Sequence, residues 1–289
     1  MILVAGATGS LGGAIARRLL TGGKRVRILV RSGASYDDLV TAGAEPVIGD
    51  LKDPTSLRAA CAGVGTVVTT ANAIGRGRED TIESVDRAGN QHLIDAAEAA
   101  GVRHFVFTSV LGASSASPVP FIQAKAATER RLSESGMRWT VLQPDLFMDT
   151  WLPMAVGGPA LAGQPVTLVG EGVRRHSMIA MADVVSYAVA ALDNDAATNA
   201  RIPIGGPEAI SWRDAIAAFE RELGREIPVR TVDHGEPVPG MPGPVLGLFQ
   251  MLETYDSPVD MSRVSATFGV RPTTLDDFVH AFVAGAAGK

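Results

Sequence analysis

The sequence has very little cysteine and no surplus of positive charge. Its 289 residues include a single cysteine, Cys61, which excludes an internal disulfide and favours a reducing compartment. The 26 lysines and arginines are outnumbered by 31 acidic residues, and the formal net charge is -5 at pH 7. Because the basic residues are scattered and form no stripe, we expect no contact with nucleic acid.

Long apolar runs are also missing, and none approaches the length of a membrane span. The opening MILVAG is typical of a strand. It lacks the charged region and the cleavage site of a signal peptide, so it makes a poor one. We therefore expect a cytoplasmic protein without membrane contact. The composition, with 46% hydrophobic and 20% charged residues, is typical of a globular protein. The chain is long enough to fold as one large domain or two modest ones.

Signatures of several other chemistries are absent. The five histidines show no zinc-ligand spacing, and no Gly-x-Ser-x-Gly nucleophile motif occurs. Neither a zinc enzyme nor a serine hydrolase is indicated.

In the first half of the chain, apolar runs rich in β-formers alternate with helical segments. The runs expected to be strands span residues 2–5, 25–30, 45–48, 66–71, 104–109 and 139–143. Helices are expected to end near Gly22, Gly101 and Gly136, and a short helix to begin at Asp53-Pro54. This alternation predicts an α/β fold with a doubly wound parallel sheet, covered by helices on both faces.

The stretch GATGSLGG follows the first expected strand and opens a helix, with glycines at positions 6, 9 and 12. In this spacing Gly6 permits the tight turn, Gly9 lets the backbone approach a pyrophosphate, and Gly12 lets helix and strand pack closely. The free N–H groups and positive dipole end of the helix favour phosphates. Its position at the head of a βαβ series favours dinucleotide binding over a tight turn without a ligand.

The ends of the next two strands bear on which cofactor is bound. Arg31 and Ser32 follow the second strand, where a basic residue can pair with a 2′-phosphate and favour NADP over NAD. The alternative is a solvated arginine. Asp50, after the third strand, either accepts a hydrogen bond from adenine, with Leu51 packed on the ring, or is an ordinary turn aspartate.

Proline and glycine become frequent after about residue 145. Short strands (VTLVG, RIPIGG) and helices near 181–192 and 211–223 are expected among long loops. We predict an NAD(P)-binding Rossmann domain over residues 1–150 and a mainly substrate-binding α/β lobe over 151–289, with elements at about 176–205 returning to the Rossmann sheet. The loops either form lids and pockets or are plain irregular structure.

Together, the motifs GATGSLGG, LVRS, GDLKDP, DAAEAAGVRHFVFTSV, ERRLSESGMRWTVLQPDLFMD and MADVVSYAVAAL resemble the atypical short-chain dehydrogenase/reductase superfamily, and most closely its NmrA-like NAD(P)H-binding branch. The resemblance covers essentially the whole chain. It implies a Rossmann domain, a small C-terminal lobe and NADP(H), preferred over NAD(H), bound beyond the strand ends.

The resemblance also assigns residues to parts of the cofactor. The pyrophosphate would be held by Gly6, Thr8, Gly9, Ser10, Leu11 and Gly12, the 2′-phosphate by Arg31 beside Ser32, and adenine by Asp50 and Leu51. Thr70, Ala71 and Asn72 would line the ribose and phosphates. Ser109, Lys125, Pro144, Leu146 and Phe147 would surround the nicotinamide, and Phe121, Met148, Trp151 and His176 would line the substrate pocket.

FIQAK matches the Tyr-x-x-x-Lys motif of tyrosine-dependent members at its lysine but not at its tyrosine. Lys125 takes the lysine position, whereas Phe121 stands one turn earlier and has no proton to give. Lys125 either acts as the acid, with a pKa lowered by burial, or anchors the ribose, or is a solvated lysine. Ser109, or Val110 one residue later, takes the place of the usual partner hydroxyl.

Other candidate residues keep alternatives open. His176 is either a pocket residue able to donate a proton or a hydrogen-bonded structural histidine. The methionines and aromatic residues of the second half line an apolar pocket or form ordinary core. Arg76 and Arg78 meet an anionic or carbonyl substrate or are solvated.

Two functions compete on this evidence. The first is an NADPH-dependent oxidoreductase that transfers hydride to a small apolar acceptor (a quinone, enone or aromatic carbonyl), with Lys125 in place of the missing tyrosine. The second is a non-catalytic, NADP-binding redox sensor of the NmrA type that binds a protein partner. Phe121 favours the second function. The first function is favoured because a quinone can take its protons from water or from a weak acid such as Lys125.

Overall fold

The computed structural model describes every residue except 75, 76, 78, 242, 288 and 289. The chain divides into two compact units. Unit 1 contains Met1–Pro144, Val184–Pro203 and Thr267–Gly269, and unit 2 contains Asp145–Asp183, Ile204–Ala266 and Val270–Lys289.

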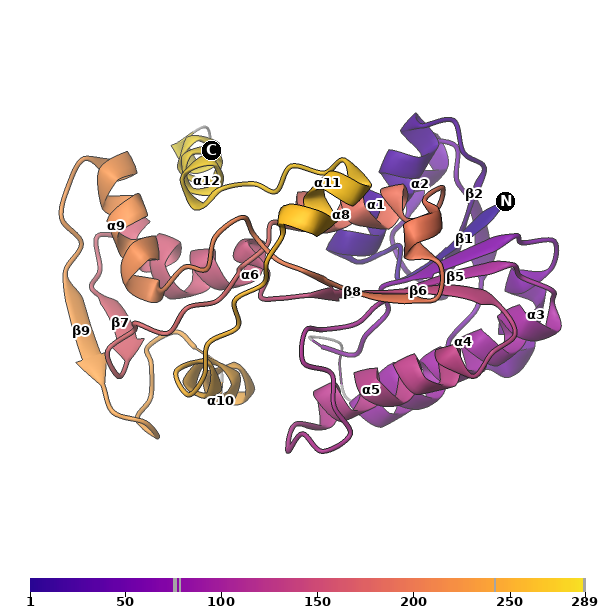
Figure 1. Cartoon of the computed structure of the whole chain (residues 1–289), viewed down its shortest axis with the longest axis horizontal. Coiled ribbons are helices and arrows are strands. Elements are labelled where there is room, and N and C mark those ends of the chain that lie inside the picture. The colour runs from indigo at the N-terminus through magenta and orange to yellow at the C-terminus, as the bar shows by residue number, and fades with distance from the viewer. Residues whose placement is uncertain (75–76, 78, 242, 288–289) are drawn as a thin grey trace. The chain divides into compact units, whose positions relative to one another are not determined.

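Unit 1 is built on a seven-stranded sheet with the order β3-β2-β1-β4-β5-β6-β8 (Figure 1). The strands are β1 (Ile2–Ala5), β2 (Val26–Val30), β3 (Glu45–Ile48), β4 (Thr66–Thr69), β5 (His104–Thr108), β6 (Arg138–Pro144) and β8 (Ala200–Ile204). The pairs from β3 to β6 are all parallel, with Ile2 of β1 opposite Val26 on one side and Thr66 on the other. This is the doubly wound Rossmann architecture that the sequence predicts.

Helices cover both faces of this sheet (Figure 1). One face carries α3 (Pro54–Cys61), α4 (Ala88–Ala99) and α5 (Pro120–Ser133), and the other carries α1 (Ser10–Thr21), α2 (Asp37–Thr41) and α8 (Met181–Ala190). A π-helical turn, η1 (Ile82–Arg87), precedes α4, and a 3-10 turn, η3 (Asp195–Ala197), precedes β8.

The burial pattern explains why these residues form a covered sheet. All five residues of β5 are buried, as expected for a central strand with helices on both sides. In α1, Ile15, Ala16 and Leu19 face the core, whereas Arg17 and Arg18 are exposed. The sheet and α3–α5 share one continuous apolar core.

Helix ends agree with the predicted signals in two of three glycine cases. Asp53 caps α3 by accepting from the Thr55 N–H, with Pro54 in the first turn, as predicted. Gly22 is the C-cap of α1, and Gly101 has φ +72° just after α4. The prediction at Gly136 is wrong, because α5 ends at Ser133 and is capped by Glu134.

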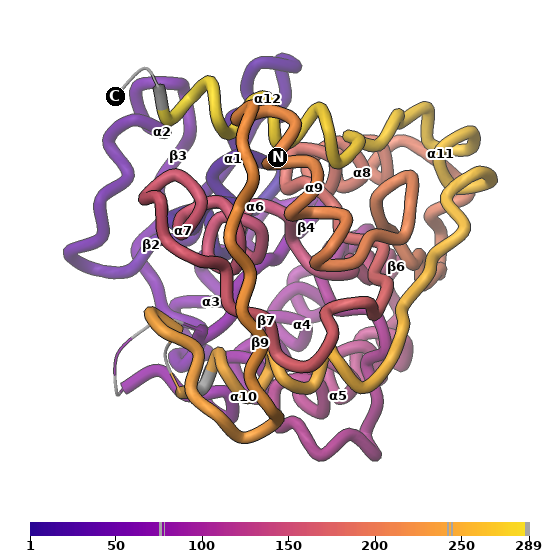
Figure 2. The backbone as a smooth tube through the Cα atoms, turned by 90° about the vertical axis from the view of Figure 1, so that its left-hand side faces the viewer, coloured from indigo at the N-terminus to yellow at the C-terminus, as the bar shows by residue number. Residues whose placement is uncertain are grey.

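Unit 2 has a core of its own around a two-stranded parallel sheet. Figure 2 shows β7 (Val166–Val169) and β9 (Val229–Val232) side by side, and their residues pair from Val166 with Val229 onwards. Its helical elements are α6 (Met148–Leu152), η2 (Pro153–Gly157), α7 (Gly158–Leu161), α9 (Trp212–Leu223), α10 (Gly243–Leu252) and α12 (Leu275–Ala287), and it contains most of α11 (Ser262–Phe268). Helix α9 begins at a reciprocal Ser211–Asp214 capping box and ends at Gly224 in the left-handed conformation.

No helix among the described residues combines the length and the apolar character that crossing a membrane requires.

The strand order places one point of the sheet at the centre of the functional question. Strands β1 and β4 are neighbours, and the chain leaves β1 in one direction and β4 in the other. At such a switch point the loops beyond the carboxyl ends of the strands separate and leave a crevice for a ligand. The glycine loop follows β1, and Thr70 to Asn72 follow β4.

Candidate functional site

The glycine loop is held by steric constraints that only glycine satisfies at two positions. Gly6 has φ +86°, and a Cβ there would lie 2.7 Å from Thr70 Oγ1. A Cβ at Gly12 would lie 2.3 Å from the Gly6 carbonyl oxygen and 2.7 Å from Thr70 Oγ1. The turn after β1 and the close approach of α1 therefore both require the missing side chains.

Gly9 is different, because little of the described protein fills the space beside it. A Cβ at Gly9 would meet only the Gly6 carbonyl oxygen, at 3.4 Å, among the described atoms. Gly9 is the N-cap of α1, and no described side chain caps this helix. The N–H groups of the first turn thus have no intrahelical acceptor and no capping side chain. This uncapped, positively polarised helix end fits the pyrophosphate of a dinucleotide.

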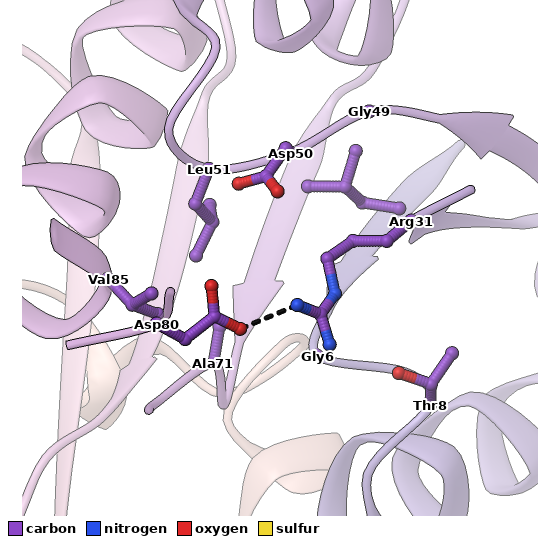
Figure 3. A pocket seen from close by; sticks show the side chains of 10 residues that line it. Gly6, Thr8, Arg31, Gly49, Asp50, Leu51, Ala71, Asp80 and Val85 are labelled. Atoms are coloured by element: carbon purple, nitrogen blue, oxygen red, sulfur yellow. Dashed lines mark hydrogen bonds and ion pairs between the residues drawn. The ribbon is translucent and has the colours of Figure 1, made fainter. Parts of the chain in front are cut away.

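A pocket opens beside this loop at the carboxyl ends of the strands (Figure 3). The residues that line it come from the ends of β1, β2, β3 and β4, from η1 and from the segment before η1, and all belong to unit 1: Gly6, Thr8, Leu29, Arg31, Gly49, Asp50, Leu51, Ala71, Asp80 and Val85. The pocket therefore brings together six of the residues assigned from the sequence, namely Gly6, Thr8, Arg31, Asp50, Leu51 and Ala71.

An ion-pair cluster that the sequence analysis missed lies in this pocket. Asp80 Oδ2 lies 2.5 Å from Arg31 Nη1, and Asp80 Oδ1 lies 2.7 Å from Lys52 Nζ. The Asp80 side chain is only 7% exposed. The Lys52 hydrogen bond and the nearby Arg31 charge hold the pKa of Asp80 below its usual range, and Asp80 raises the pKa of Lys52. No motif or spacing connects Asp80 with its partners, from which it lies 28 (Lys52) and 49 (Arg31) positions away.

The adenine-side residues are ordered by local contacts. Asp50 Oδ1 accepts a hydrogen bond from the Lys52 N–H, and the Asp50 N–H donates to Ser56 Oγ. Asp50 Oδ2 lies 3.8 Å from Lys52 Nζ. Leu51 is buried, and its carbonyl lies 3.3 Å from His92 Nδ1. Asp50 is thus partly held as the predicted turn aspartate, and it also lines the pocket.

The segment after β4 is held by hydrogen bonds to the buried side chain of Asn90. Asn90 Nδ2 donates to the Ala71 carbonyl, and the Thr69 hydroxyl donates to Asn90 Oδ1. Asn72 Oδ1 accepts from the Ile74 N–H. Residues 70 and 71, expected in the strand, instead lie just beyond it, where Ala71 lines the pocket.

Lys125 is a buried lysine and not a solvated one. Its residue is 3% exposed, and its Nζ donates to the Thr108 carbonyl at 3.0 Å. Nζ lies 4.8 Å from the ring centre of Phe107 and 5.2 Å from that of Phe121. Burial lowers the pKa of Lys125 to about 8, although the charges of Asp86 and Glu129 act in the opposite direction. Both protonation states are therefore accessible near neutral pH.

Ser109 directly follows β5 and is engaged by a buried carboxylate. Its hydroxyl donates to Glu129 Oε1 at 2.5 Å, and its N–H donates to the Leu142 carbonyl. Glu129 also accepts from Gln143 Nε2 and pairs with Arg201 at 2.8 Å. The Ser109 hydroxyl proton is thus directed to Glu129, which orients the serine beside the end of β5.

Residues expected around the nicotinamide and the substrate are divided between the units. Pro144 ends β6 in unit 1, whereas Leu146, Phe147, Met148 and Trp151 belong to unit 2. Met148 is fully buried in the unit 2 core, and Leu146 and Trp151 pack against that core. Arg76 and Arg78 lie outside the described residues.

His176 is fully buried within unit 2, and both of its ring nitrogens have partners. Nδ1 lies 2.7 Å from Ser257 Oγ, and Nε2 lies 3.0 Å from the Leu252 carbonyl. The Ser257 hydroxyl donates to Asp145 Oδ2, and burial raises the pKa of Asp145. This network is the arrangement expected of the structural alternative for His176, since the imidazole links segments far apart in the sequence.

Comparison with known proteins identifies the family. A family model described as NAD(P)H-binding matches residues 6–195. The chain is 35% identical over 232 residues to an NAD(P)H azoreductase of Xenophilus azovorans, covering 80% of this chain and 76% of the relative. It is 32% identical over 232 residues to the photosystem II assembly factor Ycf39 of Cyanophora paradoxa, covering 80% of this chain and 71% of that protein.

Solved structures with the same fold include two NADPH-linked reductases. The triphenylmethane reductase of Citrobacter sp., complexed with NADP(H), has a TM-score of 0.81 at 20% identity, covering 97% of this chain and 99% of the other. An NADPH-dependent quinone oxidoreductase of Escherichia coli, complexed with NADPH, has a TM-score of 0.78 at 21% identity, covering 98% and 100%. At these identities the likeness concerns the fold. With the family match over residues 6–195 and the uncapped glycine loop at the switch point, the chain belongs to the NAD(P)H-binding family of atypical short-chain dehydrogenase/reductases, as its motifs predict.

Proposed function

We propose that this protein is an NADPH-dependent reductase that transfers hydride to small, apolar, conjugated acceptors such as quinones, enones or aromatic carbonyls. The observation that carries the proposal is Lys125, a buried amine with a pKa of about 8 at the end of β5. A lysine used only for folding would rarely be placed where its charge costs desolvation energy.

The chemistry requires a hydride and a proton. The nicotinamide cofactor, when bound, supplies the hydride. The proton comes from the Lys125 ammonium or from water, because Phe121 has no hydroxyl and the chain's tyrosines are at positions 36, 187 and 255. A lysine with a pKa of about 8 is a suitable acid near neutral pH. The Thr108 carbonyl accepts one Nζ hydrogen bond and fixes the amine in place.

The acceptor class follows from what this acid can support. Hydride transfer to a quinone or an enone leaves a hydroquinone monoanion or an enolate, and each of these anions is stable enough to need little help from an acid, so the absence of the tyrosine is tolerable. A simple ketone yields an alkoxide and needs strong proton donation. The names of the relatives support this class, since azo compounds, quinones and triphenylmethane dyes are all conjugated acceptors.

We propose further that NADPH is preferred to NADH. Arg31 lines the pocket, Lys52 shares the Asp80 carboxylate with it, and two cations so close together suit a 2′-phosphate.

The test is NADPH consumption by the pure protein with a panel of quinones, enones, aromatic aldehydes and azo dyes. Lys125→Met keeps the side-chain volume and removes the charge, and we expect turnover to fall about 100-fold with NADPH binding retained. Lys24→Met, which removes an exposed lysine paired with Asp193, is the matched control and should behave as wild type. Full activity of Lys125→Met would exclude Lys125 as the acid.

The same assay has a pH signature. Because Lys125 must be protonated to donate, wild-type turnover with an aromatic carbonyl should decline as pH rises above about 8. Lys125→Met should show no such decline.

A second candidate is a non-catalytic NADP-binding regulator with a protein partner. It is favoured by Phe121 in the tyrosine position and by the similarity to a photosystem II assembly factor. Tight NADPH binding without turnover on any member of the panel would support this candidate over the reductase.

A further inference from the structure

Asp80 occupies an unusual position for a carboxylate in a nucleotide pocket. It lines the pocket together with Arg31 and forms ion pairs with both Arg31 and Lys52 (Figure 3 shows the Arg31 contact). Each Asp80 oxygen accepts a hydrogen bond from one cation: Oδ1 from Lys52 and Oδ2 from Arg31.

The exposed fractions of the three side chains indicate which of them is buried and which remain accessible to a ligand. The Asp80 side chain is 7% exposed, whereas Arg31 is 45% and Lys52 32% exposed. The two cations thus keep surface available to another anion, while the carboxylate accepts from Arg31 Nη1 and Lys52 Nζ. Carboxylate and phosphate oxygens are recognised by the same donors on arginine and lysine, so both compete for this place.

We propose that Asp80 is an internal competitor for the 2′-phosphate of NADPH: its carboxylate occupies the Arg31–Lys52 anion site and weakens NADPH binding without weakening NADH binding. The inference rests on the proposed use of NADPH and deepens it, by naming the residue that limits the preference between the two cofactors.

The reason is electrostatic. A 2′-phosphate brings a charge of about -1.5 to -2 to two cations that Asp80 already partly neutralises. The phosphate must then displace the carboxylate or lie beside it, and either costs binding free energy. The 2′-hydroxyl of NADH brings no charge and meets no such competition. Asp80 therefore narrows the difference in affinity between NADPH and NADH.

The test is cofactor binding by titration calorimetry with Asp80→Asn, which keeps the size and hydrogen bonding of the side chain. We expect the Kd for NADPH to fall about tenfold and that for NADH to change less than about twofold. Asp193→Asn is the matched control, because it removes one exposed, lysine-paired carboxylate outside the pocket and changes the net charge equally. It should leave both constants unchanged.

Fragment probes isolate the phosphate. Adenosine 2′,5′-bisphosphate should bind Asp80→Asn more tightly than wild type, whereas adenosine 5′-monophosphate should bind both equally. Asp80→Ser, a second variant without the charge, should reproduce the selective gain if Asp80→Asn folds poorly. Unchanged NADPH affinity in both variants would overturn the proposal. Weaker NADH binding would also overturn it, and would make Asp80 an acceptor for the ribose hydroxyl.

The result is independent of catalysis, because only binding is measured. If the protein turned over no acceptor, the reductase proposal would fail, but the NADPH affinity of Asp80→Asn would still decide the Asp80 proposal. Arg31→Met separates the remaining case: an equal loss of NADPH and NADH affinity would show that Arg31 does not meet the phosphate, which would overturn the stated preference for NADPH and the Asp80 proposal with it.

Discussion

Phe121 and Lys125 lie one turn apart on α5, with Lys125 Nζ 5.2 Å from the Phe121 ring centre. The ring and the neighbouring Phe107 replace water around the amine. Burial among these rings is why the pKa of Lys125 falls to about 8. The same position that removes the tyrosine acid thus helps to make the lysine a usable acid.

Restoring the tyrosine should broaden the acceptor class. Phe121→Tyr adds a hydroxyl at the ring edge, one turn from Lys125, and recreates Tyr-x-x-x-Lys. We expect kcat for an aromatic aldehyde to rise about 100-fold with NADPH, with quinone reduction changed only a few-fold.

Phe121→Leu controls for altered packing and should give no gain with the aldehyde. Failure of Phe121→Tyr to improve aldehyde reduction, with the variant folded and binding NADPH, would mean that the position does not face the acceptor.

The depressed pKa of Lys125 also affects stability. Its native pKa lies near 8 against 10.5 for the exposed group, so between these values the unfolded state binds more protons and stability rises with pH. The destabilising effect is complete below pH 8 and disappears as pH passes 10.5. Relative to Lys125→Met, wild type should gain about 3 kcal/mol in unfolding free energy between pH 7 and pH 10.5.

Urea unfolding of both proteins at pH 7, 8, 9 and 10 measures this difference, and the subtraction removes the effects of other titrating groups. A constant difference across the range would mean that the Lys125 pKa is not lowered by folding.

At the scale of elements, α1 and the glycine loop combine two requirements. Gly12 serves the packing of α1 on β1, because a Cβ there would overlap the Gly6 carbonyl at 2.3 Å. Gly9 serves no such packing among the described residues, since its Cβ would meet only one oxygen, at 3.4 Å. Gly12 is thus needed by the fold, whereas we expect Gly9 to be needed by the ligand.

This distinction predicts opposite outcomes for two similar substitutions. Gly12→Ala should lower the unfolding free energy of the cofactor-free protein by about 1–3 kcal/mol, because it overpacks a contact between backbones. Gly9→Ala should change stability by less than about 1 kcal/mol and weaken NADPH binding at least tenfold, because the methyl group meets the pyrophosphate.

Thermal unfolding without cofactor and NADPH titration measure the two effects separately. Gly9→Ala that binds NADPH as wild type would show that the helix end does not hold the pyrophosphate.

At the scale of the whole molecule, the pocket beside the glycine loop and the apolar core around β7 and β9 belong to different units. All residues lining the pocket lie in unit 1, as do Lys125, Ser109 and Glu129. Unit 2 has its own apolar core and its own buried polar network at Asp145, His176 and Ser257. The candidate residues for the adenine and phosphate parts of the cofactor therefore lie in unit 1, whereas unit 2 carries the nicotinamide candidates Leu146 and Phe147 and candidate residues for the substrate.

Much of unit 1 could be predicted because its information is local in sequence. Strands β1 and β5 lie within a residue of their expected bounds, since central parallel strands are short, continuously apolar runs. Strand β3 also matches its expected bounds, although it lies at the edge of the sheet and is mostly exposed. The cap at Asp53-Pro54 depends on neighbours in the chain, and the turn at Gly6 is marked by the local spacing of Gly6, Gly9 and Gly12. Gly136 failed as a cap because a glycine three residues beyond a helix end carries the same composition signal without the conformation.

The sequence by itself determined the strand–helix order, the place of the glycine turn and the absence of a tyrosine one turn before Lys125, because each depends on residue types at short, fixed spacing. Only the tertiary structure decided that Asp80 meets Arg31 and Lys52, that Glu129 engages Ser109, and that His176 is buried between Ser257 and Leu252. These contacts join residues 20 to 81 positions apart, and the packing of whole elements, which leaves no local pattern, brings them together.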